Sequence, residues 1–369
     1  MSSPATGALL AKTLTPPAAL GFVPVAAHFH LFNILVDLNQ PATGKDVLVA
    51  YNASPLALES IPPVALIEDA LYAMSGLGLV DLVGEDSYSA NALTRHLAAS
   101  PSAVHGAVHF TTEALLAGAF LMPKLKAENF AYPFKECETP MQYAYQMMGK
   151  EEYNKQHTYS IMAAEGRMDS FNSFMVGKFF KPRKTPDRLQ ALGYDLTAVV
   201  KEAGPSTSTI MVDIGGGRGE MLLEIKEAFP QFRAEDLVVE EFNDDLGDVP
   251  ATGVTLVNWN YKDKDSLQPV RGALVYHLAH ILHNLPDLDA ALLLQKISKA
   301  MEAHSRILVH EFSKNVNYAF MHSSMVALFG GRERTGSEWR RMAALAGLKV
   351  TFEAYPELGE GVIEFRLNH

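Results

Sequence analysis

The sequence predicts an α/β protein whose second half is a Rossmann-like, doubly wound sheet and whose N-terminal part is mainly α-helical and winged-helix-like. A chain of 369 residues is too long for one ordinary core. Its first half reads as short helices separated by proline and glycine. From about residue 208 onward, short runs rich in β-branched residues alternate with helical stretches, and a glycine-rich turn follows the first run.

The first segment, residues 1–110, is predicted to be a winged-helix-like dimerisation domain. Helical patterns are expected in residues 26–38 and 61–83, the second of which ends in glycine-containing turns and runs into a short strand, a polar turn and a second strand within residues 79–98. Winged helices often bind DNA, but this acidic chain has no basic recognition helix there. A packing or dimerisation role is therefore favoured over DNA binding.

The second segment, residues 111–200, is predicted to be a helical linker and substrate-pocket region. It is rich in methionine and aromatic residues at helical spacing. Such a stripe is more often plain core than a ligand-binding surface. Methionine also suits an irregular apolar ligand, so part of the stripe is expected to face a pocket. The candidate substrate-binding residues are Met147, Met168, Phe171, Met175 and, further along the chain, Met325.

Composition and charge exclude several classes of protein. The net charge of −11 argues against a nucleic-acid partner, because phosphate neutralisation needs clustered Lys and Arg. No apolar run approaches the ~20 residues needed to cross a bilayer, and the N-terminus does not resemble a secretory signal. Cys137 is the single cysteine, so a reducing, cytoplasmic location is expected. His105 and His109 share a helix face, but no third ligand is evident, and we expect no metal.

The third segment, residues 201–369, contains the predicted sheet. Its expected strands are residues 209–214, 236–241, 254–259, 273–278, 306–312, 349–355 and 361–367. Helical stretches at residues 219–229, 287–301 and 337–347 lie between several of them, as in a parallel doubly wound sheet. No helix separates the last two strands, so the final strand is expected to join the sheet as an antiparallel hairpin.

The glycine-rich turn predicts a cofactor site at the carboxyl end of the first strand. Gly215, Gly217 and Gly219 allow a tight turn and close approach of a ligand. Asp213 directly precedes them and would repel a pyrophosphate but attract a cationic amine or sulfonium. The pattern GGGRG also differs from the G-x-G-x-x-G of dinucleotide sites. Both details favour S-adenosylmethionine over NAD, with a generic Rossmann turn as the alternative.

A carboxylate at the end of the second strand is expected to accept the ribose hydroxyls of that cofactor. Two adjacent glutamates, Glu240 and Glu241, end this strand. Glu241 is the preferred candidate and Glu240 the fallback.

Four ordered motifs then resemble the class I plant and fungal O-methyltransferase family, the fungal secondary-metabolism branch in particular. They are VDIGGGRG, AHILHNLPD, RILVHEF and ALFGGRERTGSEWRRMAALAGL, and the similarity covers residues 20–369. The resemblance implies that His283 is the general base and that Glu311 and Glu333 flank it. It also implies a homodimer formed through the N-terminal helices and S-adenosylhomocysteine as a product.

The implied trio suits methyl transfer to a hydroxyl. The acceptor hydroxyl must lose its proton as it attacks the sulfonium methyl carbon, and a neutral imidazole with a pKa near ~6.5 can take that proton. A carboxylate beside the ring fixes its tautomer and stabilises the imidazolium that forms. Such base catalysis is worth about 10²–10⁴-fold, and alignment of the two substrates supplies the remainder.

Four positions depart from the family pattern. Asn284 and Leu285 stand where Asp and Trp usually follow the base, and Ala279 replaces a Lys or Arg four residues before it. Asn260 stands where an Asp is expected beside the adenine. Asn260 and the adjacent Trp259 complete the predicted cofactor-binding residues.

Three functions compete. The first is methylation of a hydroxyl on an apolar, aromatic or polyketide-type metabolite. The second is a non-methylating dehydration or pericyclic reaction on the same scaffold, with the bound sulfonium as an electrostatic element. The retained trio argues against it, and the departures at Asn260, Ala279 and Asn284 favour it. The third is a regulatory protein that binds DNA or a partner, which a salt-dependent shift with duplex DNA would reveal.

Overall fold

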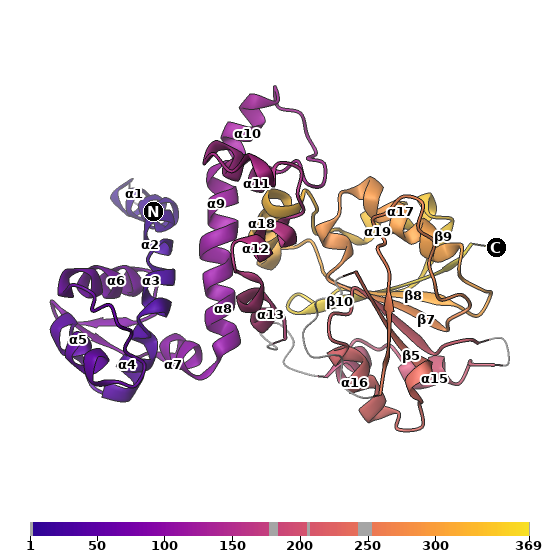
Figure 1. The fold of residues 1–369 in the computed structure, drawn as a ribbon, viewed down its shortest axis with the longest axis horizontal. Helices are drawn as coiled ribbons and strands as arrows, with labels where there is room; N and C mark the ends of the chain where they lie inside the picture. Colours follow the sequence, from indigo (N-terminus) through magenta and orange to yellow (C-terminus); the bar gives the residue numbers. More distant parts are fainter. Residues whose placement is uncertain (1–2, 177–183, 205–206, 243–252, 369) are drawn as a thin grey trace. The chain divides into compact units, whose positions relative to one another are not determined.

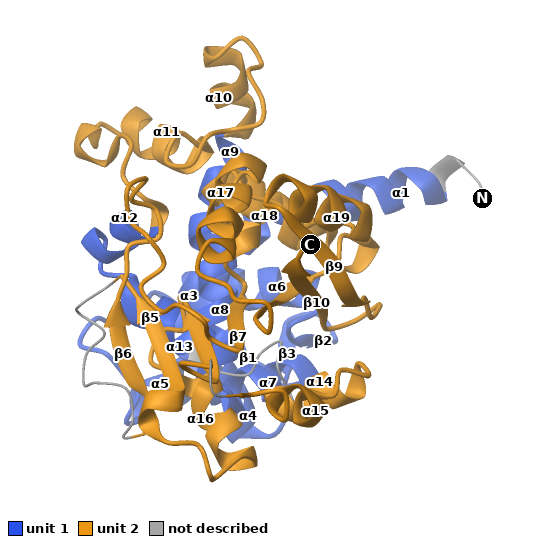
Figure 2. Ribbon diagram, turned by 90° about the vertical axis from the view of Figure 1, so that its right-hand side faces the viewer, with its two compact units in different colours: residues 1–120, 159–179 blue, residues 121–158, 180–369 orange. Residues whose placement is uncertain are grey.

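The structure is a computed structural model that describes residues 3–176, 184–204, 207–242 and 253–368. The chain forms two compact units that interleave in sequence (Figure 2). Unit 1 contains residues 1–120 and 159–179, and unit 2 contains residues 121–158 and 180–369. The predicted segment 111–200 is thus divided between the units, and its residues 177–183 lie outside the described ones.

Unit 1 is mainly helical, as predicted. Its helices are α1 (Ser3–Leu14), α2 (Pro16–Leu20), α3 (Val23–His28), α4 (Leu31–Leu38), α5 (Gly44–Ala53), α6 (Val64–Gly76), α7 (Ala92–Ala99), α8 (Pro101–His109), α9 (Leu115–Ala119) and α13 (Met168–Val176), with a π-helical turn, Phe110–Ala114, between α8 and α9. Helix α12 (Thr158–Ala164) begins at the unit boundary.

A small antiparallel sheet completes the winged-helix-like part of unit 1. Strands β2 (Asp81–Val83) and β3 (Ser87–Ser89) form a hairpin, and β1 (Ala42–Thr43) pairs with the other edge of β3. The predicted helix at residues 26–38 is divided into α3 and α4, because His30 has a φ of +51°. Helix α13, although distant in sequence, packs on α8, and this explains why residues 159–179 join unit 1.

Unit 2 contains a seven-stranded sheet in the order β6-β5-β4-β7-β8-β10-β9. All seven predicted strands are confirmed: β4 (Met211–Ile214), β5 (Leu237–Glu241), β6 (Thr255–Asn258), β7 (Val275–Ala279), β8 (Arg306–Phe312), β9 (Leu348–Ala354) and β10 (Glu360–Leu367). Strand β10 is antiparallel to both β8 and β9 and lies between them. The predicted hairpin is therefore present, with β9 at the sheet edge.

Helices cover both faces of this sheet (Figure 1). Along each strand, successive side chains enter opposite layers, as the pleat requires. One layer contains α17 (Asp287–Ser298) and α19 (Gly336–Leu345), with core residues such as Val212 and Trp339. The other contains α14 (Thr185–Ala191), α15 (Leu196–Val200) and α16 (Glu220–Ala228), with core residues such as Met211 and Leu222. These layers hold the carboxyl ends of the parallel strands in fixed register.

Three further helices belong to unit 2: α10 (Leu121–Ala127), α11 (Pro140–Met147) and α18 (Ala319–Phe329). Helix α11 packs on α18. The hydroxyls of Thr139 and Thr158 both donate to the carbonyl of Leu328 near the end of α18, which ties residues 121–158 to the sheet unit. Among the described residues, no helix has the length and apolar character needed to span a bilayer.

Candidate active site

The glycine-rich turn joins β4 to α16 and has the backbone geometry that its glycines predict. Gly215, Gly217 and Gly219 all have positive φ, at 68°, 57° and 86°, a region that L-residues seldom adopt. A Cβ on Gly215 would lie 2.5 Å from the side chain of Ile281, whereas a Cβ on Gly217 would meet no atom within 4 Å. The turn is therefore packed at Gly215 and open at Gly217, where a ligand can approach the backbone.

Asp213 lies beneath the turn rather than on its open side. It is 3% exposed, and one of its carboxylate oxygens is 2.7 Å from Nδ1 of His277 on β7. The Nε2 atom of His277 is in turn 2.8 Å from Nδ1 of His310 on β8. Asp213, His277 and His310 thus form a hydrogen-bonded network across three adjacent strands, which sequence reasoning missed because it depends on strand order.

The two glutamates that end β5 have different surroundings. The Glu241 carboxylate accepts hydrogen bonds from the backbone N–H of Gly217 at 3.2 Å and of Phe242 at 2.9 Å. Glu240 is buried and accepts a hydrogen bond from Gln268. Burial raises the pKa of Glu240 to about 8. The geometry therefore favours Glu241, the glutamate beside the turn, for contact with a cofactor.

Trp259 and Asn260 directly follow β6, next to the end of β5. The N–H of Trp259 donates to the carbonyl of Glu241, and its ring is 5% exposed. The side-chain oxygen of Asn260 accepts from the N–H of Lys262 and so caps the following turn. Both residues lie at the same sheet edge as the glycine-rich turn.

His283 lies in a 3-10 turn, Leu282–Asn284, directly after β7, and the structure places both predicted carboxylates beside it. Its Nδ1 atom is 2.9 Å from Glu333 and 3.4 Å from Glu311. The other oxygen of Glu311 accepts the backbone N–H of His283 at 3.1 Å. Glu311 and Glu333 are each 1% exposed and His283 is 7% exposed. The three residues predicted from separate motifs thus form one buried group.

Burial and the neighbouring charges shift the pKa values of His283 and Glu311. Burial alone would lower the pKa of His283, but the carboxylates of Glu311 and Glu333 outweigh burial and raise it to about 9. Burial likewise raises the pKa of Glu311 to about 7. The imidazole is therefore held as a cation paired with carboxylate, and it must lose this proton before it can accept another.

Two residues that sequence reasoning missed hold the turn that carries His283. The Arg334 guanidinium is fully buried and donates to the carbonyls of Leu282 and Leu285, each at 2.7 Å. Gly331 packs so closely against the backbone that a Cβ there would overlap the carbonyl oxygen of His283. The fourth motif thus holds the turn that carries His283 and also supplies Glu333; the GGRER string gave no sign of this supporting role by itself.

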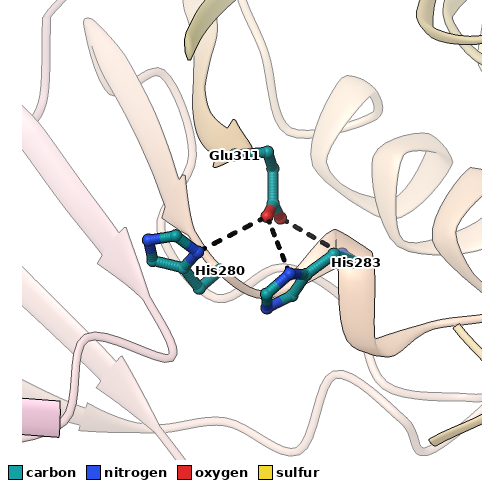
Figure 3. A group of neighbouring side chains, drawn as sticks. All are labelled: His280, His283 and Glu311. Carbon is teal, nitrogen blue, oxygen red and sulfur yellow. Dashed lines mark hydrogen bonds and ion pairs between the residues drawn. The ribbon is translucent and has the colours of Figure 1, made fainter. Parts of the chain in front are cut away.

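A second histidine, His280, lies on the other side of Glu311 (Figure 3). Its Nδ1 atom is 3.7 Å from Glu311, and its Nε2 atom is hydrogen-bonded to Glu360 at the start of β10. His280 has a φ of +55°, which costs about 1–3 kcal/mol in a residue other than glycine. The sequence showed the histidine, but the partner Glu360 comes from a strand 80 residues later.

The candidate substrate-binding residues are divided between the units. Met147 on α11 and Met325 on α18 belong to unit 2, with Met325 buried and Met147 exposed. Met168, Phe171 and Met175 lie on α13 in unit 1, where the ring of Phe171 contacts His109 and Tyr159. Their role in substrate binding remains a prediction.

His105 and His109 do not form a metal-ligand set among the described residues. His105 is hydrogen-bonded to Ser170 at 2.9 Å, and His109 is paired with Glu113 at 3.2 Å. Each histidine thus has its own polar partner within unit 1.

Residues 149–349 match the sequence model of the O-methyltransferase domain family. The O-methyltransferase bfoE of Aspergillus brasiliensis is 49% identical over 98% of this chain and 96% of its own length. The O-methyltransferase aunE of Aspergillus niger is 46% identical over 98% of this chain and 97% of its own length.

Two solved structures share the fold. OxaC in complex with S-adenosylhomocysteine and oxaline has a TM-score of 0.79 at 19% identity, covering 100% of this chain and 88% of that one. An enzyme described as a pericyclic reaction enzyme has a TM-score of 0.75 at 20% identity, covering 98% of this chain and 89% of that one.

Proposed function

This chain belongs to the O-methyltransferase family, in its fungal secondary-metabolism branch, and is an S-adenosylmethionine-dependent O-methyltransferase; we propose that it methylates a hydroxyl of an apolar, aromatic or polyketide-type metabolite with His283 as the general base. The observation that carries this proposal is the buried contact of His283 with Glu333 and Glu311 beside the carboxyl ends of β7 and β8.

The residues of the glycine-rich turn fit the cofactor. A Cβ on Gly217 would enter open space, and the neighbouring Glu241 carboxylate has the two oxygens that a ribose diol needs. Asn260 and Trp259 are the candidates for the adenine side, and Asp213 favours a cationic group from beneath the turn. When bound, S-adenosylmethionine supplies an electrophilic methyl carbon.

The trio positions a proton acceptor. The Glu333 carboxylate accepts Nδ1–H of His283, which leaves the Nε2 lone pair of the neutral ring to take the proton of the acceptor hydroxyl. Glu311 accepts the backbone N–H of the same residue and fixes the turn. Both carboxylates then stabilise the imidazolium, and burial excludes water that would weaken this interaction.

The acceptor is proposed to be apolar because methionine and aromatic side chains dominate the helices named for substrate binding. Met325 and Met147 in unit 2, and Phe171, Met168 and Met175 in unit 1, offer adaptable apolar surface. The proposed acceptor would develop negative charge only on the hydroxyl oxygen that loses its proton.

Incubation with methyl-labelled S-adenosylmethionine and panels of phenolic and polyketide acceptors, followed by mass spectrometry, tests this function. We expect a labelled ether product and an equal amount of S-adenosylhomocysteine. A cofactor that stays intact while an unlabelled metabolite changes would instead support the non-methylating reaction. The fold shared with the pericyclic reaction enzyme and the departures at Ala279 and Asn284 favour this second candidate.

A further inference from the structure

We propose that His280, His283 and Glu311 form a binding site for a divalent transition metal, Zn²⁺ in particular, and that the bound metal inhibits the enzyme. The inhibitory part rests on the proposed role of His283 as the base, whereas the site itself rests on geometry alone. The three donor atoms lie within 4.8 Å of one another in the buried centre of unit 2.

The two distances from Glu311 to the histidine nitrogens suit shared coordination of a metal rather than hydrogen bonds. Zn²⁺ binds nitrogen and oxygen at about 2.0–2.2 Å in a tetrahedron, which places neighbouring ligand atoms roughly 3.4 Å apart. The Oε2 atom of Glu311 is 3.4 Å from Nδ1 of His283 and 3.7 Å from Nδ1 of His280. Hydrogen bonds between such groups are normally ~2.7–3.2 Å long.

Figure 3 shows both imidazole rings turning a nitrogen toward the Glu311 carboxylate. This carboxylate is 1% exposed, and its Oε2 atom has no hydrogen-bond partner among the described residues. A carboxylate oxygen is costly to bury unless a cation lies beside it, a role that the His283 imidazolium fills here and that a bound metal ion would take over. Glu333, with an oxygen 2.9 Å from Nδ1 of His283, is near enough to supply a fourth ligand.

The surrounding residues orient the ligands as they do in metal sites. Glu360 is ion-paired with Arg188 at 3.3 Å, so it is a carboxylate and accepts Nε2–H of His280. That tautomer leaves the Nδ1 lone pair of His280 on the side of Glu311. A carboxylate–histidine–metal arrangement of this kind is typical of zinc sites. Two imidazoles with a carboxylate also favour Zn²⁺, Co²⁺ or Ni²⁺ over Mg²⁺ or Ca²⁺.

Metal binding would block the base by changing its tautomer. Coordination at Nδ1 of the His283 imidazolium releases the proton shared with Glu333 to solvent and leaves the other ring proton on Nε2. His283 then has no lone pair for the acceptor hydroxyl. The side chains of His280 and His283 are 7% and 9% exposed, which gives the ion a route of entry.

Titration of the untagged full-length chain with Co²⁺, followed by visible absorption, tests the site. We expect d–d bands that saturate at one ion per chain and disappear on addition of Zn²⁺. His280→Asn tolerates the positive φ but removes a ligand, and should weaken Co²⁺ binding at least about tenfold, by analogy with the ~10–100-fold effect of second-shell changes. Glu360→Gln is a second variant with the ligands intact and should weaken binding to a similar degree.

His304→Asn is the matched control, because His304 lies at the opposite end of β8 and is hydrogen-bonded to Gly272. Equal Co²⁺ affinity in wild type and His280→Asn, or no saturable binding, would overturn the site. Inhibition is measured as the fraction of each variant's own metal-free rate that remains at increasing Zn²⁺. Compared with the wild-type chain, the Zn²⁺ concentration that halves this rate should be at least about tenfold higher in His280→Asn and unchanged in His304→Asn. A His280-dependent Co²⁺ signal without Zn²⁺ inhibition would overturn only the inhibition. Failure to find methyl transfer would leave the Co²⁺ result intact.

Discussion

At the scale of single residues, the chemistry of His283 is set by its two carboxylate partners. An isolated histidine after a strand is more often structural than catalytic. Here Glu333 and Glu311 lie 2.9 and 3.4 Å from its Nδ1 atom and hold its pKa at about 9, above the ordinary value. Substitutions at this group should therefore separate proton transfer from cofactor binding.

His283→Gln should lower kcat by about 10²–10⁴-fold, the usual contribution of a positioned base. Cofactor affinity should stay within about twofold by calorimetry, because the glycine-rich turn and Glu241 form a separate contact. His304→Gln is the matched control and should retain full activity. Activity above a few per cent in His283→Gln would remove this residue as the base.

Glu333→Gln should shift the pH dependence of kcat/KM to lower pH. A base works only when unprotonated, so the rate of the wild-type chain should rise with pH through the pKa of His283, about 9. Loss of the Glu333 charge lowers that pKa, because one of the carboxylates that raise it is gone. The maximal rate should fall as well. A rising limb at unchanged or higher pH would contradict this assignment, and Glu353→Gln, at the sheet edge, serves as the control.

At the scale of elements, the turn after β7 depends on the segment after α18. Arg334 and Gly331 lie about 50 residues from His283 in sequence, yet they contact the backbone of its turn directly. The turn that carries His283 is thereby held by a second segment, as precise placement of the proposed base requires.

Arg334→Leu should destabilise the chain and slow the reaction. The carbonyls of Leu282 and Leu285 would lose their donors, and each buried, unsatisfied carbonyl costs about 1–3 kcal/mol. Arg332→Leu is the matched control: Arg332 pairs with the same Asp287, but its side chain is 31% exposed, so the loss should be at most about 1 kcal/mol. Urea unfolding measures both. Equal losses would mean that Arg334 does not anchor the turn.

Gly331→Ala should displace the turn because the new methyl group would overlap the carbonyl of His283. Overpacking of this kind costs about 1–3 kcal/mol, and kcat should fall more than cofactor affinity. Gly204→Ala meets no atom within 4 Å and is the matched control. Wild-type kcat in Gly331→Ala would show that the turn tolerates the shift.

At the scale of the whole molecule, the family resemblance predicts a homodimer formed through the N-terminal helices. Helix α1 exposes Leu9, Leu10 and Leu14 by 57–65% each, although apolar side chains are usually buried. Leu10→Asp should therefore convert a dimer into a monomer in light scattering without unfolding either unit. A wild-type monomer would contradict the prediction.

Local pattern was sufficient for the strands and the glycine-rich turn, whereas the trio was implied by the family resemblance of the four motifs. The seven strand-length runs alternate with helices, and the four motifs carry His283, Glu311 and Glu333 in fixed order. These features are predictable because strand formation and positive-φ glycine turns depend on near neighbours in sequence. The split between α3 and α4 at His30 was not predictable from the sequence, because no glycine or proline marks it.

The amino-acid sequence by itself determined the α/β class, the family and the residues of the proposed chemistry. Only the tertiary structure decided how those residues are supported: Asp213 through His277 and His310, the base turn through Arg334 and Gly331, and His280 through Glu360. Each of these contacts joins segments distant in the chain, and it exists because the order of strands in the sheet brings them together. Hydrophobic periodicity specifies which residues face a core, but not which strand lies beside which.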